Sequence, residues 1–338
     1  MDIPGYSWRP YLPDTIYGWL AHALIFMDLI LRIFLAERNA ADNLRRLSSW
    51  KARPGESPNT QVIVSIVGYR EDPLLFKNCL ERYLKSGSKY LVVGVDGNQP
   101  EDENMVRVFR NVGHMKSCFE SILTGSTMKV FSHHGDTIVL RLESCIGWSI
   151  ARDASDPSTL ESRETLESSA FAKLYAITRH QLEKSIFSRG ISRNETPLFV
   201  CFTQPHAGLK EIRLATLILS IVLADLYDTE YIWSSDSDTL VCDETLPSIA
   251  RILSAEAKAA GASALVRLNN AHQSSVSSMA SAGFMCDAFL NRAALSALGR
   301  SECLNGPGSM FKKSALRKVV VPWYQYSYPG SASCMVCN

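Results

Sequence analysis

Aspartates follow directly on two apolar segments, where their carboxylates could take part in chemistry. Asp96 comes after YLVVGV, and Asp236 and Asp238 come after EYIWSS. If the two segments are parallel strands of one sheet, these side chains face one crevice, because ligands bind outside the carboxyl ends of such strands. Two carboxylates at i, i+2 can share a hard divalent cation with a substrate diphosphate. Asp96 suits a contact to the base or ribose of a nucleotide. The Asp-x-Asp triplet is also common on solvated turns.

The sequence predicts an α/β fold with a mostly parallel sheet that positions these aspartates. Gln61–Gly68 is a continuous β-branched apolar run, typical of a parallel strand buried on both faces. A helical pattern over Leu74–Lys85 and a second strand at Tyr90–Val95 complete a βαβ unit. Residues 100–195 are more polar and less regular, so we expect an insertion with helices, one of them at roughly Ser168–Phe187. Further on, the pattern predicts strands at Pro197–Phe202, Glu230–Ser234 and 263–268, and helices at Leu209–Leu226, 244–260 and 287–299.

An apolar segment near the N-terminus is long enough to cross a membrane. Residues 16–36 are mostly apolar over 21 positions, which as a helix would span about 32 Å. Asp28 and Arg32 interrupt the segment at i, i+4 spacing, so they can pair on one face. Two interpretations stay open, a membrane-spanning helix and a helix that lies in the membrane interface or packs on the protein. Lys and Arg residues cluster after the segment, so the positive-inside rule places everything after residue 40 in the cytoplasm.

Composition and charge argue against several classes of protein. The chain has 338 residues and 35 Lys and Arg against 34 Asp and Glu, so its formal net charge is +1. A general nucleic-acid binder would show a basic excess, so we expect no nucleic-acid partner. Nine cysteines at irregular spacing favour reduced thiols in a cytosol-facing domain. Cys334 and Cys337 form a C-x-x-C, but nothing nearby supplies further zinc ligands. A dehydrogenase is disfavoured because no G-x-G-x-x-G follows the first strand.

The chain is expected to have four parts. Residues 1–50 form an N-terminal membrane-associated segment. Residues 51–60 are rich in Pro, Gly, Ser and charge and form a linker. Residues 61–330 form the globular α/β domain, and residues 331–338 form a short tail.

A resemblance to a known family is carried by VIVSIVGYRED (62–72), LVVGVDGN (91–98), YIWSSDSDT (231–239) and GFMCDAFLNRAALSALGRSECLNGPGSMFKKSAL (283–316). These stretches resemble the family 2 glycosyltransferases of the processive polysaccharide-synthase type, which include hyaluronan, chitin and cellulose synthases, and most of all the fungal type. The resemblance implies a GT-A type nucleotide-diphospho-sugar domain on the cytoplasmic face of a membrane. It also implies inverting, metal-dependent transfer of a sugar from a UDP-sugar to a growing cell-surface or cell-wall polysaccharide.

The resemblance also implies roles for particular residues on the donor side. Asp96 would contact the uridine part of the UDP-sugar, and Asp236 and Asp238 would hold Mg²⁺ or Mn²⁺ on the diphosphate. Lys210 matches a basic position near the diphosphate, although the family usually has a Lys directly after the Gly, where Leu209 stands here. A solvated helix residue is the plainer interpretation of Lys210.

Two further segments match the family at the ends of the sugar site. Tyr69, Arg70 and Glu71 match the residues that line the nucleotide pocket after the first strand. The loop Asn305-Gly306-Pro307-Gly308 resembles the loop at the acceptor end of the site. Alternatively, Arg70 and Glu71 form a surface ion pair, and the Gly-Pro-Gly segment is a plain turn.

The end of the chain departs from the family pattern. Family members continue with an acidic motif whose last Asp is the general base, then with Gln-x-x-Arg-Trp and several membrane helices. Residues 331–338 match none of these, and Asp287 does not stand at the base position. We therefore expect a truncated synthase whose transfer is slow or absent, since general base catalysis contributes about 10²–10⁴-fold. The alternatives are a non-processive transferase acting on a small molecule or lipid, and a non-catalytic donor-binding partner of a full-length synthase.

Overall fold

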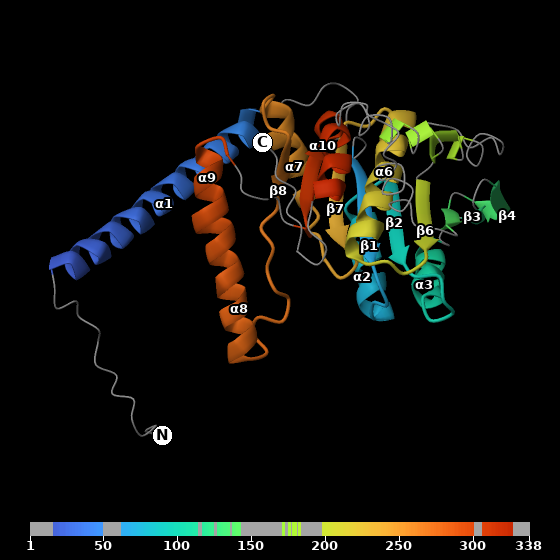
Figure 1. The fold of residues 1–338 in the computed structure, drawn as a ribbon, viewed down its shortest axis with the longest axis horizontal. Helices are drawn as coiled ribbons and strands as arrows, with labels where there is room; N and C mark the ends of the chain where they lie inside the picture. Colours follow the sequence, from blue (N-terminus) through green and yellow to red (C-terminus); the bar gives the residue numbers. More distant parts are fainter. Residues whose placement is uncertain are drawn as a thin grey trace, which may run out of the picture. The chain divides into compact units, whose positions relative to one another are not determined.

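The structure is a computed structural model in which the chain divides into two compact units. One unit comprises residues 1–42 and 267–300, and the other comprises residues 43–266 and 301–338. Figure 1 shows their helices and strands in colours that follow the sequence. The structure describes residues 16–49, 62–113, 117–124, 127–135, 137–142, 198–300 and 306–326, with short helical pieces between 171 and 183.

A nine-stranded sheet forms the centre of the larger unit (Figure 1). The strands are β1 Val62–Gly68, β2 Tyr90–Asp96, β3 Ser117–Thr124, β4 Thr127–Gly135, β5 Thr137–Leu142, β6 Leu198–Gln204, β7 Tyr231–Asp236, β8 Gly261–Ser263 and β9 Ser309–Lys312. They lie in the order β4-β3-β5-β6-β2-β1-β7-β9-β8. The pairs from β3 across to β7 are parallel, whereas β4, β9 and β8 pair antiparallel at the two sides. The predicted α/β fold with a mostly parallel sheet is confirmed.

Helices cover both faces of this sheet and bury it in two apolar layers. One face packs against α2 (Pro73–Lys85), α3 (Glu103–Gly113) and α7 (Thr245–Ala255), and the other packs against α6 (Leu209–Leu226) and α10 (Lys313–Tyr326). Successive strand residues point to opposite faces, so Val64 of β1 joins the first layer and Ile63 joins the second. Because both faces are covered, β1 and β2 are buried at every position, which explains their continuous apolar runs.

The middle of the chain differs from the sequence-based expectation. The polar composition of residues 100–195 predicts a helical insertion, but β3, β4 and β5 extend the sheet beyond β6. Their sequences, such as SCFESILT in β3, mix polar and apolar residues without a clean alternation, so no strand period stands out. Short helical pieces at 171–172, 175–176, 178–180 and 182–183 lie within the predicted helix at 168–187.

Most of the helix α1 (Ile16–Ser49) belongs to the smaller unit and carries the apolar N-terminal segment. Among the described residues it is the helix that is long and apolar enough to cross a membrane. Arg32 donates to Asp28 at 2.7 Å, as their spacing predicts, and to Oδ1 of Asn291 at 3.0 Å. Large apolar side chains along α1 are exposed, including Leu20, Leu24, Ile25, Phe26, Met27, Ile30, Leu31 and Phe34. The choice between a spanning and an interfacial helix stays a prediction.

The second segment of the smaller unit contains a continuous run of helix, residues 275–297, whose pitch changes along its length. The expected helix at 287–299 is preceded by α8 (Ser275–Cys286) and is itself divided into the π-helix η2 (Asp287–Ala293) and α9 (Ala294–Ala297). A π-helix brings residues i and i+5 together, and Arg292 accordingly pairs with Asp287 at 2.7 Å.

In the larger unit, the strand that the sequence predicts at 263–268 is found as β8. It is shorter than predicted and begins earlier in the chain.

Replacement of Leu217 by Ala tests the packing of α6. Leu217 is fully buried in the layer between α6 and the sheet, so the change should lower the free energy of unfolding by about 2–5 kcal/mol. Leu209→Ala, at a side chain that is 56% exposed on the same helix, should stay within about 0.5 kcal/mol. Urea titrations followed by circular dichroism measure both. Equal losses in the two variants would contradict the burial of α6.

Candidate functional site

The two acidic turns lie at the same edge of the sheet. β1 lies between β2 and β7, and the three strands are parallel. Val67 is in register with Asp236, and Gly68 is in register with Val95, the residue before Asp96. Neighbouring strands are about 4.8 Å apart, so Asp96 and Asp236 are roughly 10 Å apart along this edge. The structure thus brings together the turns that the strand pattern of the sequence placed at one crevice.

The Asp236–Asp238 turn is held by the end of β1. Ser237 is buried between the two aspartates, and its backbone N–H donates to the carbonyl of Val67 at 2.9 Å. Gly68 leaves the space for Ser237, because a Cβ on Gly68 would lie 2.2 Å from the Ser237 Oγ. The Asp236 side chain is 32% exposed and Asp238 is exposed, so both carboxylates can reach a ligand outside the sheet edge.

Three carboxylates influence one another at this turn. Burial raises the pKa of Asp236, the Arg213 guanidinium opposes that change, and the charge of Asp238 adds to it. Burial also raises the pKa of Glu71, which follows β1, and the charges of Asp238 and Asp236 raise it further. Ionising all three side chains is therefore costly unless a positive charge lies between them.

Arg213 supplies such a charge and was missed by sequence reasoning. It stands on the second turn of α6, and its Nη2 donates to Oδ1 of Asp236. Its Nη1 would lie 3.0 Å from a Cβ on Gly306, so the side chain passes between the Asp-x-Asp turn and the Gly-Pro-Gly loop. The one sequence signal was the presence of a basic residue just before the long apolar run of α6.

The Asp96 carboxylate is occupied by the loop between β6 and α6. Oδ1 accepts from the Gln204 side chain at 3.2 Å and from the Ala207 N–H at 3.0 Å. Oδ2 accepts from the Gly208 N–H at 2.8 Å and lies 2.8 Å from Nδ1 of His206. The side chain is buried, so its visible role is to fix this loop. The predicted contact with uridine stays a prediction.

Tyr69 and Arg70 form the rim beside this loop. The Tyr69 ring stacks on His206 with 4.2 Å between ring centroids and 20° between the planes. Arg70 has a left-handed backbone with φ of +51°, and its Nε donates to Asp102 at 3.1 Å. Its guanidinium carbon also lies 5.0 Å from the centroid of the Tyr69 ring. Its partners on this rim, which include Glu101 at 3.6 Å, stand after β2, so an Arg70–Glu71 surface pair is not what the structure holds.

Lys210 faces α10 instead of the acidic turn. Its Nζ lies 4.8 Å from the centroid of the Tyr324 ring, and burial lowers its pKa. The Tyr324 hydroxyl donates to Glu211, the next residue of α6. Lys210 is therefore partly buried, which does not fit the interpretation as a solvated helix residue.

The Gly-Pro-Gly loop runs directly into the sheet. Gly308 has φ of +81°, its N–H donates to the carbonyl of Ser234 at 3.0 Å, and its carbonyl accepts from Ala264 at 2.8 Å. Gly306 lies beside Arg213, and Asn305 lies outside the described residues. The loop is thus a turn tied to β7, and its predicted place at the acceptor end of a sugar site stays a prediction.

The carboxylates fit a cation that is shared with a ligand. No three His, Cys, Asp or Glu side chains within the described ranges lie close enough together to hold a metal ion by themselves. Mg²⁺ and Mn²⁺ sites at phosphates need only one or two carboxylates, because phosphate oxygens and water complete the shell. Asp236 and Asp238, with Glu71 beside them, meet that requirement, whereas a closed structural metal site is not what they form.

The cysteines and Asp287 are further side chains of the kind that can bind a metal ion. The Cys79 and Cys201 thiols are buried, those of Cys242 and Cys286 are exposed, and none of these four cysteines forms a disulfide. The pair Cys334 and Cys337 lies outside the described residues. Asp287, in the smaller unit, accepts from Arg292 and Asn291.

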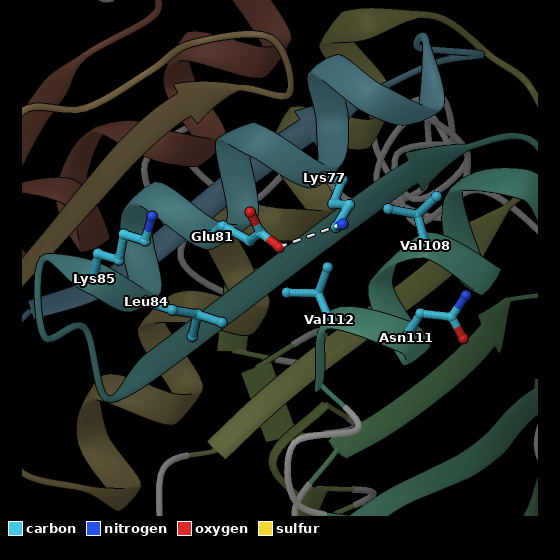
Figure 2. Close-up of a pocket in the computed structure, with 7 residues that line it drawn as sticks. All are labelled: Lys77, Glu81, Leu84, Lys85, Val108, Asn111 and Val112. Carbon is cyan, nitrogen blue, oxygen red and sulfur yellow. Dashed lines mark ion pairs between the residues drawn. The ribbon is translucent and has the colours of Figure 1, made fainter.

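A pocket between α2 and α3 is separate from this edge of the sheet. Figure 2 shows it with the Lys77–Glu81 ion pair, 3.6 Å long, at its wall. α2 begins at the carboxyl end of β1 and returns to the amino end of β2, so its last turn lies opposite the acidic turns. The pocket is lined by Lys77, Glu81, Leu84, Lys85, Val108, Asn111 and Val112.

The architecture is that of an α/β protein with a mostly parallel sheet, and it is consistent with a GT-A-like glycosyltransferase fold. No protein-family model matches the chain. The chain is 23% identical to hyaluronan synthase 3 of Xenopus laevis over 277 residues, which covers 81% of this chain and 40% of the relative. It is 23% identical to human hyaluronan synthase 3 over 336 residues (97% of this chain, 51% of the relative). It is 24% identical to hyaluronan synthase 2 of Bos taurus over 329 residues (95% and 48%).

The chain therefore spans about half the length of the curated hyaluronan synthases that it matches. The similarity runs over most of the chain, and it supports a relationship to the processive synthases among the family 2 glycosyltransferases.

Replacement of Glu71 by Gln tests the electrostatics of the acidic turn. A raised pKa means that folded Glu71 keeps its proton to a higher pH than unfolded Glu71 does. Raising the pH from about 4 therefore ionises the unfolded chain first and lowers the free energy of unfolding of the wild type. Because Gln does not ionise, the stability of the variant relative to the wild type should rise between about pH 4 and pH 7. Urea unfolding across this range measures the difference.

Glu81→Gln on α2 is the matched control, since Glu81 pairs with Lys77 and lies away from the acidic turns. A Glu71→Gln difference that stays constant with pH would show that the pKa of Glu71 is not raised in the folded protein.

Proposed function

We propose that this protein is an inverting hexosyltransferase that transfers a sugar from a UDP-sugar to a growing cell-surface or cell-wall polysaccharide with the help of Mg²⁺ or Mn²⁺. The observation that carries the proposal is the acidic edge formed by Glu71, Asp236 and Asp238, in a chain that is similar to hyaluronan synthases over 81–97% of its length. The names of these relatives describe the polymer that those enzymes make. For this chain we propose only the class of reaction.

The carboxylates have a specific task in such a reaction. The acceptor hydroxyl oxygen attacks the anomeric carbon while the bond from that carbon to the diphosphate oxygen breaks, and the hydroxyl proton passes to a base. Asp236 and Asp238 would hold the divalent cation, which neutralises the charge on the departing diphosphate. Asp96 fixes the loop before α6, and Tyr69 and His206 present an aromatic rim on which a nucleobase could stack. We assign no residue as the base.

Membrane association is part of the proposal. The apolar segment of α1 exposes its large side chains, and a lipid environment would bury them. We propose that α1 anchors the protein to the membrane and that the sheet domain lies on the cytoplasmic side, where the basic residues after the segment would hold it.

Calorimetric titration of the detergent-solubilised protein with UDP tests the donor site. Wild-type protein should bind UDP more tightly with Mn²⁺ than without it. The double variant Asp236→Asn/Asp238→Asn should lose the metal-dependent part, because it removes the charges that hold the cation. Asp243→Asn, an exposed acid in the loop that follows the same strand, is the matched control and should bind like the wild type.

Transfer assays separate the alternatives. Radiolabelled UDP-sugars that yield a long polymer would support a processive synthase, and a product with a single added sugar would indicate a non-processive transferase. Metal-dependent UDP binding without sugar transfer would indicate a donor-binding protein. A folded wild type that binds no UDP in either condition would contradict the proposal.

A further inference from the structure

We propose that Arg213 binds the diphosphate of the donor, and that Asp236 holds the Arg213 guanidinium in place until the donor and its cation arrive. The proposal rests on the proposed function, because it concerns the same site. It adds a phosphate-binding residue that neither the motifs of the sequence nor its similarity to hyaluronan synthases indicated.

Arg213 is the basic residue that pairs with the Asp-x-Asp turn in the described part of the chain. Arg70 and Lys210 also stand near this edge of the sheet and contact other residues. Arg70 is held by Asp102 and Glu101 after β2, and Lys210 lies over the Tyr324 ring of α10. Arg213 alone among these three is paired with an aspartate of the turn.

The guanidinium has hydrogen-bonding capacity to spare. The Arg213 side chain is only 13% exposed, and its Nη2 donates to Asp236. Its Nε is buried and has no acceptor among the described residues. Nη1 lies beside Gly306, 3.0 Å from where a Cβ on that residue would stand. A buried N–H without an acceptor is costly, and a phosphate oxygen is the kind of acceptor that would satisfy it.

Charge explains why Arg213 would change partners. A divalent cation on Asp236 and Asp238 places positive charge beside the guanidinium, which weakens the Arg213–Asp236 pair. A diphosphate that enters with the cation offers paired oxygens, the geometry that guanidinium binds best. Arg213 would then pass from Asp236 to the diphosphate, and Asp236 would be left to the cation. Cation and diphosphate should therefore bind cooperatively.

Arg213→Gln in the detergent-solubilised protein tests this exchange. UDP binding in the presence of Mn²⁺ should weaken by about 10-fold to 100-fold, because a charged hydrogen bond to phosphate is lost. Uridine lacks the diphosphate, so its binding, measured by ligand-observed NMR, should not change. Binding of Mn²⁺ alone should strengthen several-fold, because Arg213 no longer competes for Asp236. Arg213→Lys keeps the charge without the paired geometry and should weaken UDP binding by a smaller factor.

Arg317→Gln is the matched control. Arg317 pairs with Asp225 at 2.8 Å near the other end of α6, so its loss also breaks an Arg–Asp pair of the same domain. It should leave the binding of UDP, uridine and Mn²⁺ unchanged. If Arg213→Gln does not fold, Arg213→Lys, which keeps the positive charge beside Asp236, still tests the role of Arg213.

The outcomes separate this inference from the proposed function. If the wild type binds UDP with Mn²⁺ and Arg213→Gln binds it equally well, Arg213 is not a diphosphate residue and the proposed function stands. If UDP and uridine weaken by the same factor, Arg213 only supports the fold of the site, and the inference is wrong. A wild type that binds no UDP would overturn both.

Discussion

The burial of the Glu71 and Asp236 carboxylates beside Asp238 is the constraint that the rest of the site has to meet, because burial disfavours their ionised forms and mutual repulsion adds to that cost. The register of β1 against β7 fixes where Asp236 stands, and the buried Ser237 fixes the turn that carries Asp238. The backbone of Asp236 therefore cannot shift without breaking the sheet ladder. Burial and proximity raise the pKa values of Asp236 and Glu71, so a compensating cation is worth more here than on an open surface. Arg213 provides part of that compensation.

Asp96, the other aspartate at this edge of the sheet, is stabilised in a different way. Asp96 receives backbone N–H groups from Ala207 and Gly208 at the start of α6, together with the Gln204 amide. These donors are fixed by the fold, so the negative charge of Asp96 is used to shape a loop. Asp236 is balanced instead by the side chain of Arg213, which the proposed exchange would transfer to the diphosphate. The permanent partner suits a structural role, and the exchangeable partner suits a group that must accept a ligand.

The fold was predictable where one physical signal dominated. The strands β1 and β2 are covered on both faces, so their continuous apolar runs made them recognisable in the sequence. The positions of Asp96 and of the Asp-x-Asp turn followed from where β2 and β7 end. The strands β3 to β5 lie toward one side of the sheet, and their mixed sequences carry no clear period. Arg213 stands near the beginning of α6, where a basic side chain can equally well be solvated, so its type and position alone pointed to no partner. Its importance depends on how α6 packs against β7, which is a tertiary fact.

The support beneath the acidic turn limits which parts of the site can move. Trp233 of β7 donates to the Tyr83 hydroxyl at 2.9 Å, and the Cys79 Sγ lies 3.2 Å from the carbonyl of Thr239, just past Asp238. Burial raises the pKa of the Cys79 thiol to about 12, so it stays neutral and adds no charge to the carboxylates above it. With the backbone of the turn held by a neutral, buried layer, a ligand meets rigid carboxylate positions, and the adjustment falls to the Arg213 side chain. A site arranged in this way loses little order when it binds, because most of its geometry exists before the ligand arrives.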